Sequence, residues 1–421
     1  MTAPRNDWLL WLCASRTALS LIFCAYAGVL PFVREAWGMS AAQAATVQSA
    51  WQLGYLVSLF AVGLLADRYG ARRTYLVGSV LAAASALLFA LAATDYPSAV
   101  LLYGLAGLCS GGSYTPGLAL IHRHSPPHLR GRAMGWFVGA SSLGYALALV
   151  GIAVLGALWS WRAGLVFAGL AAGVGACCGW RALRELVDEV RPATAPAAGG
   201  LTPLADTLRD RRAMACNWAY TFHCWELFAL WAWLPSFLAA AAGSGGALGA
   251  SLGIGMAALA HLVGVAGSVG GGIAGDRLGR VRAMLVISCA SLACSFLFGW
   301  LWALPFWLLV LAAGLYNLLA VADSSVYSSA LAEAVPPHRL GAGYSVRSVM
   351  GFGAGAASPV VFGLALDAGV AGFGADSALS WVAAWSSVGL GALLGPAMIL
   401  RFQALQRTAE RSPMLSESGE A

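Results

Sequence analysis

The chain contains no lysine: all 24 of its basic residues are arginine. Because the phosphate-binding motif of ATP-driven pumps ends in a Gly-Lys pair, this absence excludes that motif. Charged residues of both signs make up only 10% of the sequence, whereas soluble domains carry about 25%. A water-soluble chain of this length would therefore have too little polar surface to cover its core.

Clusters with the spacing of metal ligands or catalytic groups are also lacking. The nine Cys lie within apolar runs and predict small buried side chains. His122, His124 and His128 flank a Pro-Pro turn, which favours a solvated loop over a metal site. No nucleophile–base pair is visible in the sequence. We therefore expect neither an enzyme nor a bound cofactor or metal.

Apolar residues, in contrast, make up 60% of the chain, and the mean hydropathy is +0.75. A membrane-spanning helix needs roughly 20 apolar residues. Twelve runs of this kind lie near 10–33, 43–66, 74–94, 98–121, 133–157, 162–181, 213–240, 250–275, 283–303, 306–333, 342–366 and 378–401. Because lipid cannot satisfy free backbone groups, these runs predict an all-α integral membrane protein. The Gly/Ser-rich stretch 107–116 predicts close helix contact and a local break within the fourth run, and Ser40 is the expected N-cap of the second.

Most arginines gather in alternate connections between these runs. The opposite connections hold little beyond Arg34 and Arg162. By the positive-inside rule, both termini face the cytoplasm of a bacterial-type inner membrane. We find no cleavable signal, because the first run is too long and lacks a small-residue cleavage site. The net charge of +6 thus reflects topology, and we expect a bilayer and no nucleic acid as partner.

Two motifs recur at nearly the same interval. Asp67 and Asp276 lie in similar charged hairpins 209 residues apart, and Pro126 and Pro336 lie in similar Pro-Pro turns 210 residues apart. Six spans separate the equivalent hairpins, so the repeats have the same orientation. We predict a six-helix bundle over 1–181, a cytoplasmic linker over 182–212, a second bundle over 213–401 and a mobile cytoplasmic tail over 402–421.

The first hairpin resembles the signature G-x-x-x-D-R-x-G-R-R of the major facilitator superfamily (MFS). Its matching residues are Gly63, Asp67, Arg68, Gly70, Arg72 and Arg73, and those of the second copy include Gly272, Asp276, Arg277, Gly279 and Arg280. The resemblance implies two bundles around a cavity that opens alternately to each side. It also implies that Asp67 and Asp276 close the cytoplasmic end by accepting hydrogen bonds at a helix N-terminus of the opposite half.

Some familiar features of the superfamily are missing. Tyr103 stands where many proton-driven drug exporters carry an Arg, and the fifth span has no Gly-Pro motif. Spans two and eight lack the Arg of nitrate-type members. These departures disfavour drug–proton antiport and nitrate transport.

Few polar residues lie deep in the runs. A charge at that depth costs about 2.5–3.5 kcal/mol on insertion scales and is kept mainly where it faces a cavity or a partner. The candidates for substrate or proton binding are Glu226, His223, Asp323, Arg347, His261, Arg16 and Trp225. Glu226 and His223 are three residues apart and share one side of a helix. Burial favours the neutral form of a carboxyl or an imidazole, so such groups can exchange a proton near the working pH.

Each candidate has a structural alternative. Glu226 could simply bond to His223, Asp323 could pair with Arg347, and His261 could be a satisfied interior residue. Arg16 could reach the cytoplasmic headgroups instead of the cavity. Facing the cavity, Arg16 and Arg347 would form a positive site whose fork of donors matches a carboxylate.

The sequence therefore predicts a monomeric, twelve-span secondary transporter that moves a small organic solute, an anion, by proton-coupled symport. Two rivals remain open. One is an exporter of amphipathic compounds that uses the aromatic residues of the seventh span. The other is a transporter-like sensor that binds a solute without moving it.

Overall fold

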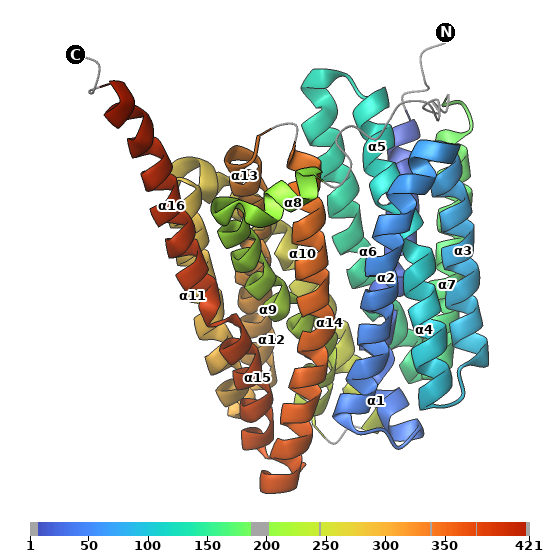
Figure 1. Cartoon of the computed structure of the whole chain (residues 1–421). Helices are drawn as coiled ribbons and strands as arrows, with labels where there is room; N and C mark the ends of the chain where they lie inside the picture. Colours follow the sequence, from blue (N-terminus) through green and yellow to red (C-terminus); the bar gives the residue numbers. More distant parts are fainter. Residues whose placement is uncertain (1–6, 187–201, 244–245, 337–338, 376, 418–421) are drawn as a thin grey trace.

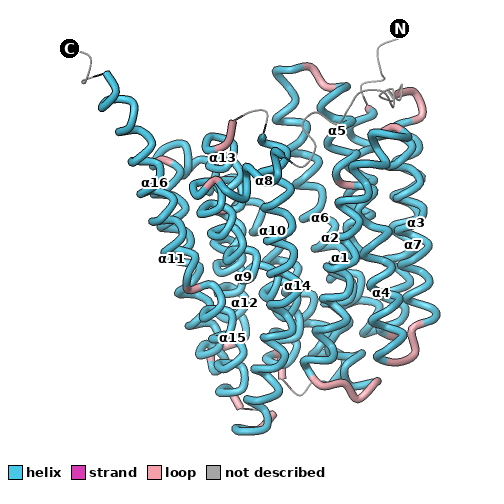
Figure 2. The backbone as a smooth tube through the Cα atoms, in the orientation of Figure 1, coloured by secondary structure: helices cyan, strands magenta, loops and turns pink. Residues whose placement is uncertain are grey.

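The computed structural model describes residues 7–186, 202–243, 246–336, 339–375 and 377–417. These residues form long helices that run along one common axis (Figure 1). Figure 2 shows the turns confined to the two ends of the bundle. Helix α1 begins and helix α16 ends at the same end (Figure 1). We call it the terminal end and the opposite one the distal end.

The first half of the molecule contains six spans. Its helices are α1 (Trp8–Ala36), α2 (Ala41–Tyr69), α3 (Ala71–Ala92), α4 (Tyr96–Ser110), η1 (Gly111–Ser113), α5 (Thr115–His124), η2 (Pro127–Leu129), α6 (Arg130–Leu158) and α7 (Trp161–Leu183). The fourth span is α4, η1 and α5 together. The expected break in it is confirmed at Gly111–Ser113, where a Cβ on Gly112 would lie 2.8 Å from Cα of Gly78 on α3.

The second half repeats this pattern. Its helices are α9 (Arg211–Ala241), α10 (Gly246–Leu278), α11 (Arg280–Leu297), η3 (Phe298–Ala303), α12 (Phe306–Ala322), α13 (Ser324–Ala334), α14 (Leu340–Phe373), α15 (Ala378–Ala392) and α16 (Leu394–Glu417). A short helix, α8 (Thr202–Arg209), lies within the predicted linker. Helix α16 continues through Glu417, so most residues expected to form a mobile tail are helical.

Among the described residues, eleven helical segments are long and apolar enough to cross a membrane. The fourth span is missing from this count because η1 divides it into two helices that are each too short. With α4 and α5 taken as one span, the architecture confirms the predicted all-α fold of twelve helices.

The two halves meet through α2 against α14 and α6 against α10. At the distal end the contact is tight, since a Cβ on Gly363 of α14 would lie 2.7 Å from the carbonyl oxygen of Ala41 on α2. Towards the terminal end the helices part. A Cβ on Gly63, Gly135 or Gly139 would have no heavy atom within 4 Å beyond its own helix and chain neighbours. The gap between the halves thus opens towards the terminal end.

Candidate functional site

A cavity of about 900 Å³ lies between the two halves, which is large enough for a small organic solute. Its walls come mainly from spans one, two, four and five of the first half and the equivalent spans of the second half. The charged side chains on the walls are Arg16, Arg347 and, in the last turn of α2, Asp67. The deeper part of the cavity therefore carries positive charge.

Arg16 is the ninth residue of α1 and is buried in the cavity wall. Its Nε donates to Oγ of Ser141 at 2.8 Å, and an Nη donates to Oγ of Ser113 at 3.3 Å. Its guanidinium carbon lies 4.8 Å from the ring centre of Tyr114. The side chain faces the cavity and does not extend to the headgroups.

Arg347 is the eighth residue of α14, about 12 Å along the helix from its start. One Nη donates to Oγ of Ser328 at 2.8 Å, and the guanidinium lies 4.5 Å from the ring centre of Tyr220 and 4.6 Å from that of Tyr344. Its Nε is buried without a hydrogen-bond partner among the described residues. This guanidinium has unused capacity to bind an anion.

The two arginines occupy mirrored arrangements. In the first half, Arg16 on the first span lies 5.8 Å from the ring of Phe137 on the fifth span. In the second half, Tyr220 on the equivalent of the first span contacts Arg347 on the equivalent of the fifth. Phe137 and Arg347 are both the eighth residue of their helices, α6 and α14. Each half thus pairs a guanidinium with an aromatic ring. The arginine is on the first span in the first half, whereas in the second half it is on the equivalent of the fifth span.

Aromatic side chains from both halves close the cavity towards the distal end. We call Phe23, Trp51, Tyr145, Phe228 and Trp231 the distal aromatic cluster. The ring centre of Phe23 lies 4.9 Å from that of Trp51, 5.0 Å from that of Tyr145 and 5.8 Å from that of Trp231. The cluster provides an apolar surface for the body of a solute below the two guanidinium groups.

His261 lies beside the distal aromatic cluster. Its ring centre is 5.5 Å from that of Trp231 and 5.7 Å from that of Tyr145, and the side chain is buried in the cavity wall. Its Nε2 lies 3.9 Å from Sγ of Cys24. Trp231 in turn donates to Oδ1 of Asn317 at 2.8 Å. The structure therefore brings His261 into the same cavity as Arg16 and Arg347.

His223 and Asp323 lie together behind the cavity wall of the second half. Nδ1 of His223 is 2.8 Å from Oδ1 of Asp323. Nε2 of His223 is 2.8 Å from Oγ of Ser324, which lines the cavity. Asp323 thus pairs with His223, and the expected alternative partner Arg347 binds Ser328 instead.

Glu226 and Trp225 lie away from the cavity. Oε1 of Glu226 accepts hydrogen bonds from Ser291 at 2.6 Å and Ser295 at 2.7 Å, both on α11. Trp225 packs against α15, where a Cβ on Gly391 would lie 2.0 Å from its Nε1. These contacts give Glu226 and Trp225 partners inside the second bundle.

The cavity face of α9 instead consists of residues outside the predicted substrate and proton site, although Tyr220 and Trp231 belong to the aromatic residues that the exporter alternative uses. They recur at helical spacing and are Tyr220, Cys224, Leu227, Phe228 and Trp231. Glu226 follows Cys224 by two residues and so points to the opposite side of the helix. The helical spacing of Tyr220, Cys224 and Trp231 was the available signal, but it does not say which side faces a cavity.

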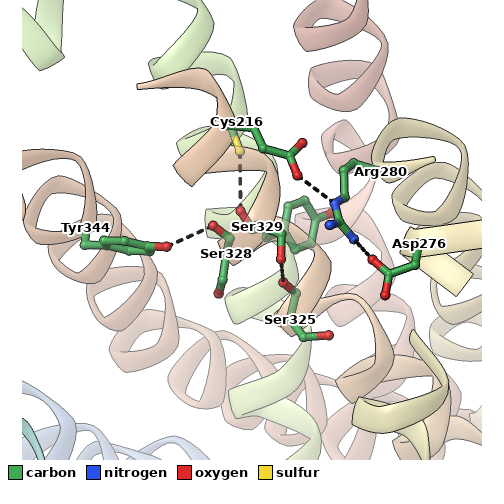
Figure 3. Close-up of polar contacts among 9 residues, drawn as sticks. Cys216, Asp276, Arg280, Ser325, Ser328, Ser329 and Tyr344 are labelled. Atoms are coloured by element: carbon green, nitrogen blue, oxygen red, sulfur yellow. Dashed lines mark hydrogen bonds and ion pairs between the residues drawn. The ribbon is translucent and has the colours of Figure 1, made fainter. Parts of the chain in front are cut away.

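The residues of the predicted gating motif lie at the terminal end. Asp67 is exposed at the cavity mouth. In the second half, Arg280 binds Asp276 at 2.7 Å (Figure 3). It also binds Glu333 at 3.0 Å. Asp276 therefore pairs within its own half in this conformation, whose terminal end is open. The expected contacts to the opposite half belong to the other conformation and remain a prediction.

A carboxylate does close the distal end in the manner expected for Asp67. Asp367 of α14 accepts hydrogen bonds from the backbone N–H groups of Ala41 at 2.8 Å and Ala42 at 2.9 Å, the first residues of α2. Arg34 lies 3.7 Å from the same carboxylate. Ser40, the predicted N-cap, forms a capping box with Gln43. The sequence analysis missed Asp367, although an acid near the end of the eleventh span was a usable signal.

These features define a two-bundle helical membrane protein with a central cavity that is open at one end. The chain belongs to the Major Facilitator Superfamily, whose family model matches residues 12–359. Members of this family are membrane transporters and generally not enzymes. The chain is similar to the hexuronate transporter of Bacillus subtilis (24% identity; 53% of this chain, 52% of the relative) and to the probable sulfoacetate transporter SauU of Cupriavidus necator (26%; 59% of each). It spans about half the length of the curated relatives it matches.

Solved structures support the fold. A bacterial homologue of the lysosomal transporter Spinster, in an inward-facing and unoccupied conformation, aligns with a TM-score of 0.72 at 16% identity over 98% of both chains. The D-xylose–proton symporter aligns with a TM-score of 0.70 at 14% identity over 92% of this chain and 96% of that one.

Proposed function

We propose that this protein is a proton-coupled secondary transporter of small organic anions. The observation that carries the proposal is the pair of guanidinium groups, Arg16 and Arg347, on opposite walls of the central cavity. Among the described residues, hydroxyls and aromatic rings surround both groups, and neither makes an ion pair with a carboxylate. Two positive charges without a carboxylate partner in the same cavity favour a negatively charged ligand.

The nature of the relatives supports the same substrate class. Hexuronate and sulfoacetate, the solutes in the names of two relatives, are organic anions. A carboxylate or sulfonate fits the planar fork of an arginine. The distal aromatic cluster would contact the less polar part of the solute.

We assign the terminal end to the cytoplasm, because the arginine-rich connections gather there. The structure then represents an inward-open conformation, in which Asp367 and the distal aromatic cluster close the outer side. The His223–Asp323 pair is the proposed proton site, since both groups are buried and titratable and touch a residue of the cavity wall. Glu226 is held by two hydroxyls away from the cavity, so we place it second as a proton site.

Transport into proteoliposomes tests the proposal. We expect radiolabelled glucuronate or sulfoacetate to accumulate when the outside is made acidic relative to the lumen, and Arg347→Ala to abolish this accumulation. Equal accumulation with and without the pH gradient would contradict the proton coupling. Transport of hydrophobic cations and of none of the anions would overturn the substrate class.

Export of amphipathic compounds is the second candidate. The distal aromatic cluster favours it, because five rings from both halves offer more apolar contact than a small acid needs. The two guanidinium groups disfavour a cationic cargo. An exporter of this kind would therefore carry compounds that combine an anionic group with an apolar body.

A further inference from the structure

Ser324 connects the cavity with the buried His223–Asp323 pair. It is the first residue of α13 and directly follows Asp323, where the tenth span is interrupted. Its side chain lines the cavity, and its Oγ lies 2.8 Å from Nε2 of His223. Nδ1 of His223 lies 2.8 Å from Oδ1 of Asp323. Three side chains thus form a continuous polar path from the cavity wall into the second bundle.

In the deprotonated pair, the direction of these contacts is determined by charge. A ring nitrogen that faces a carboxylate carries the proton, so Nδ1 of His223 is the N–H and Nε2 has the lone pair. Nε2 then accepts the hydroxyl proton of Ser324. A serine has only one hydroxyl proton, so Ser324 presents lone pairs to the cavity. Lone pairs do not stabilise an anion.

One added proton reverses the contact between Nε2 and Ser324. If the imidazole takes the proton, both of its nitrogens become donors. If Asp323 takes it, the carboxyl O–H donates to Nδ1 and the imidazole proton lies on Nε2. In either case Nε2 donates to Oγ of Ser324, and the hydroxyl proton is free to point into the cavity. The result does not depend on which of the two coupled groups holds the proton.

The surroundings of His223 link this proton to the anion site. The titratable or charged side chains near it are Tyr220, Cys224 and Glu226 on α9, Asp323, Tyr327 on α13, and Arg347 on α14. Arg347 lies one ring away, with its guanidinium 4.5 Å from the ring centre of Tyr220. An anion bound to this guanidinium would bring a negative charge close to the pair, and a nearby negative charge favours proton uptake.

Ser324 is also connected to Arg347 through Ser328. Arg347 donates to Oγ of Ser328, and Ser328 donates to the carbonyl oxygen of Ser324, one turn away. The hydroxyl of Ser324 therefore lies one turn of α13 from the serine that binds the guanidinium of Arg347, and both Ser324 and Arg347 line the cavity.

We propose that Ser324 couples proton binding to anion binding: proton uptake by the His223–Asp323 pair turns its hydroxyl into a donor towards the anion that Arg347 holds. The inference rests on the proposed function as an anion transporter. Because linkage is reciprocal, the bound anion raises the proton affinity of the pair by the same factor. Proton and anion would then load together, as symport requires.

The test is the pH dependence of anion affinity, measured by calorimetry on the detergent-purified full chain with glucuronate and sulfoacetate as probes. For wild type we expect affinity to rise as pH falls, by up to about tenfold per pH unit for one coupled proton. Ser324→Ala should bind as tightly as wild type at alkaline pH but lose more than half of this slope, and Ser324→Thr should restore it.

A matched control is Ser348→Ala. Ser348 also lines the cavity, but its hydroxyl donates to the carbonyl oxygen of Tyr344, so the variant should keep the wild-type slope. A full slope in Ser324→Ala, or loss of slope in Ser348→Ala as well, would overturn the role of Ser324. Anion binding without any pH dependence in wild type would overturn the coupling alone. Failure of wild type to bind any of a panel of carboxylates and sulfonates would contradict the proposed function itself.

Discussion

The two halves of this protein share one fold, yet they differ in the chemistry of their interiors. Each half places one guanidinium against an aromatic ring on the cavity wall. Among the described residues, however, the buried carboxyl groups, Glu226 and Asp323, both belong to the second half. The first half keeps its described acids at helix ends. The comparison teaches that the proposed anion site draws on both halves, whereas the proposed proton site lies in the second bundle alone.

The largest expected effect comes from removing one of the two mirrored charges. Truncating a buried charge that contacts an ionic ligand costs roughly 2–5 kcal/mol. We therefore expect Arg347→Ala to weaken anion binding by about 30-fold or more, as measured by calorimetry. Arg16→Ala should have a similar effect if the halves contribute equally. Arg339→Ala, which changes the residue directly before the same helix and outside the cavity wall, is the control and should bind normally.

Asp323→Asn should break the asymmetry between the halves. The variant keeps the shape of the side chain but removes the charge that holds the proton site, so anion binding should become nearly independent of pH. In wild type, the anion affinity should change by up to about tenfold per pH unit. Calorimetry at several pH values measures how anion affinity depends on pH. The same dependence in Asp323→Asn as in wild type would show that the proton site lies elsewhere.

The distal contact between the halves provides the next test. Asp367→Ala removes the acceptor for two N–H groups at the start of α2 and the ionic partner of Arg34. Loss of such a cap costs about 0.5–2 kcal/mol, so hydrogen exchange at Ala41 and Ala42 should quicken by roughly 2- to 30-fold. Glu35→Ala, in the last turn of α1 at the same end of the molecule, should leave this exchange unchanged. Equal exchange in Asp367→Ala and wild type would show that the carboxylate does not hold the distal end closed.

The smallest effect on function is expected for Glu226→Gln. Its carboxylate bonds to Ser291 and Ser295 inside the second bundle. The amide keeps one oxygen that can accept from these serines but loses the charge of the carboxylate, so the melting temperature should fall by roughly 2–6 °C. Anion affinity and its pH dependence should stay as in wild type. Loss of the pH dependence in this variant would assign the proton site to Glu226 instead of Asp323.

Much of the fold could be predicted because it depends on composition along the chain. Apolar runs predicted the twelve spans, and the glycines of 107–116 predicted the break at Gly111–Ser113. Ser40 was recognisable as a cap because its bond to Gln43 is local. Asp367 was not, since its partner Ala42 lies 325 residues away in the sequence.

The rotation of each helix was the main unknown in the site. Glu226 and Cys224 are only two residues apart on α9, but knowledge of the rotation is needed to tell that Cys224 faces the cavity and Glu226 the packed side. The unknown rotation also left the partner of Asp323 open. Arg347 and His223 were both candidates because of their depth in the membrane, and the structure pairs Asp323 with His223.

The most direct test of the central claim is a thermal-shift measurement on the detergent-purified protein with organic acids, amines and drug-like cations. A ligand that binds only the folded state raises its apparent stability. With an anion site in the cavity, carboxylates and sulfonates should raise the melting temperature of wild type and leave that of Arg347→Ala unchanged. Stabilisation by hydrophobic cations alone, unchanged in Arg347→Ala, would contradict an anion site between the two halves.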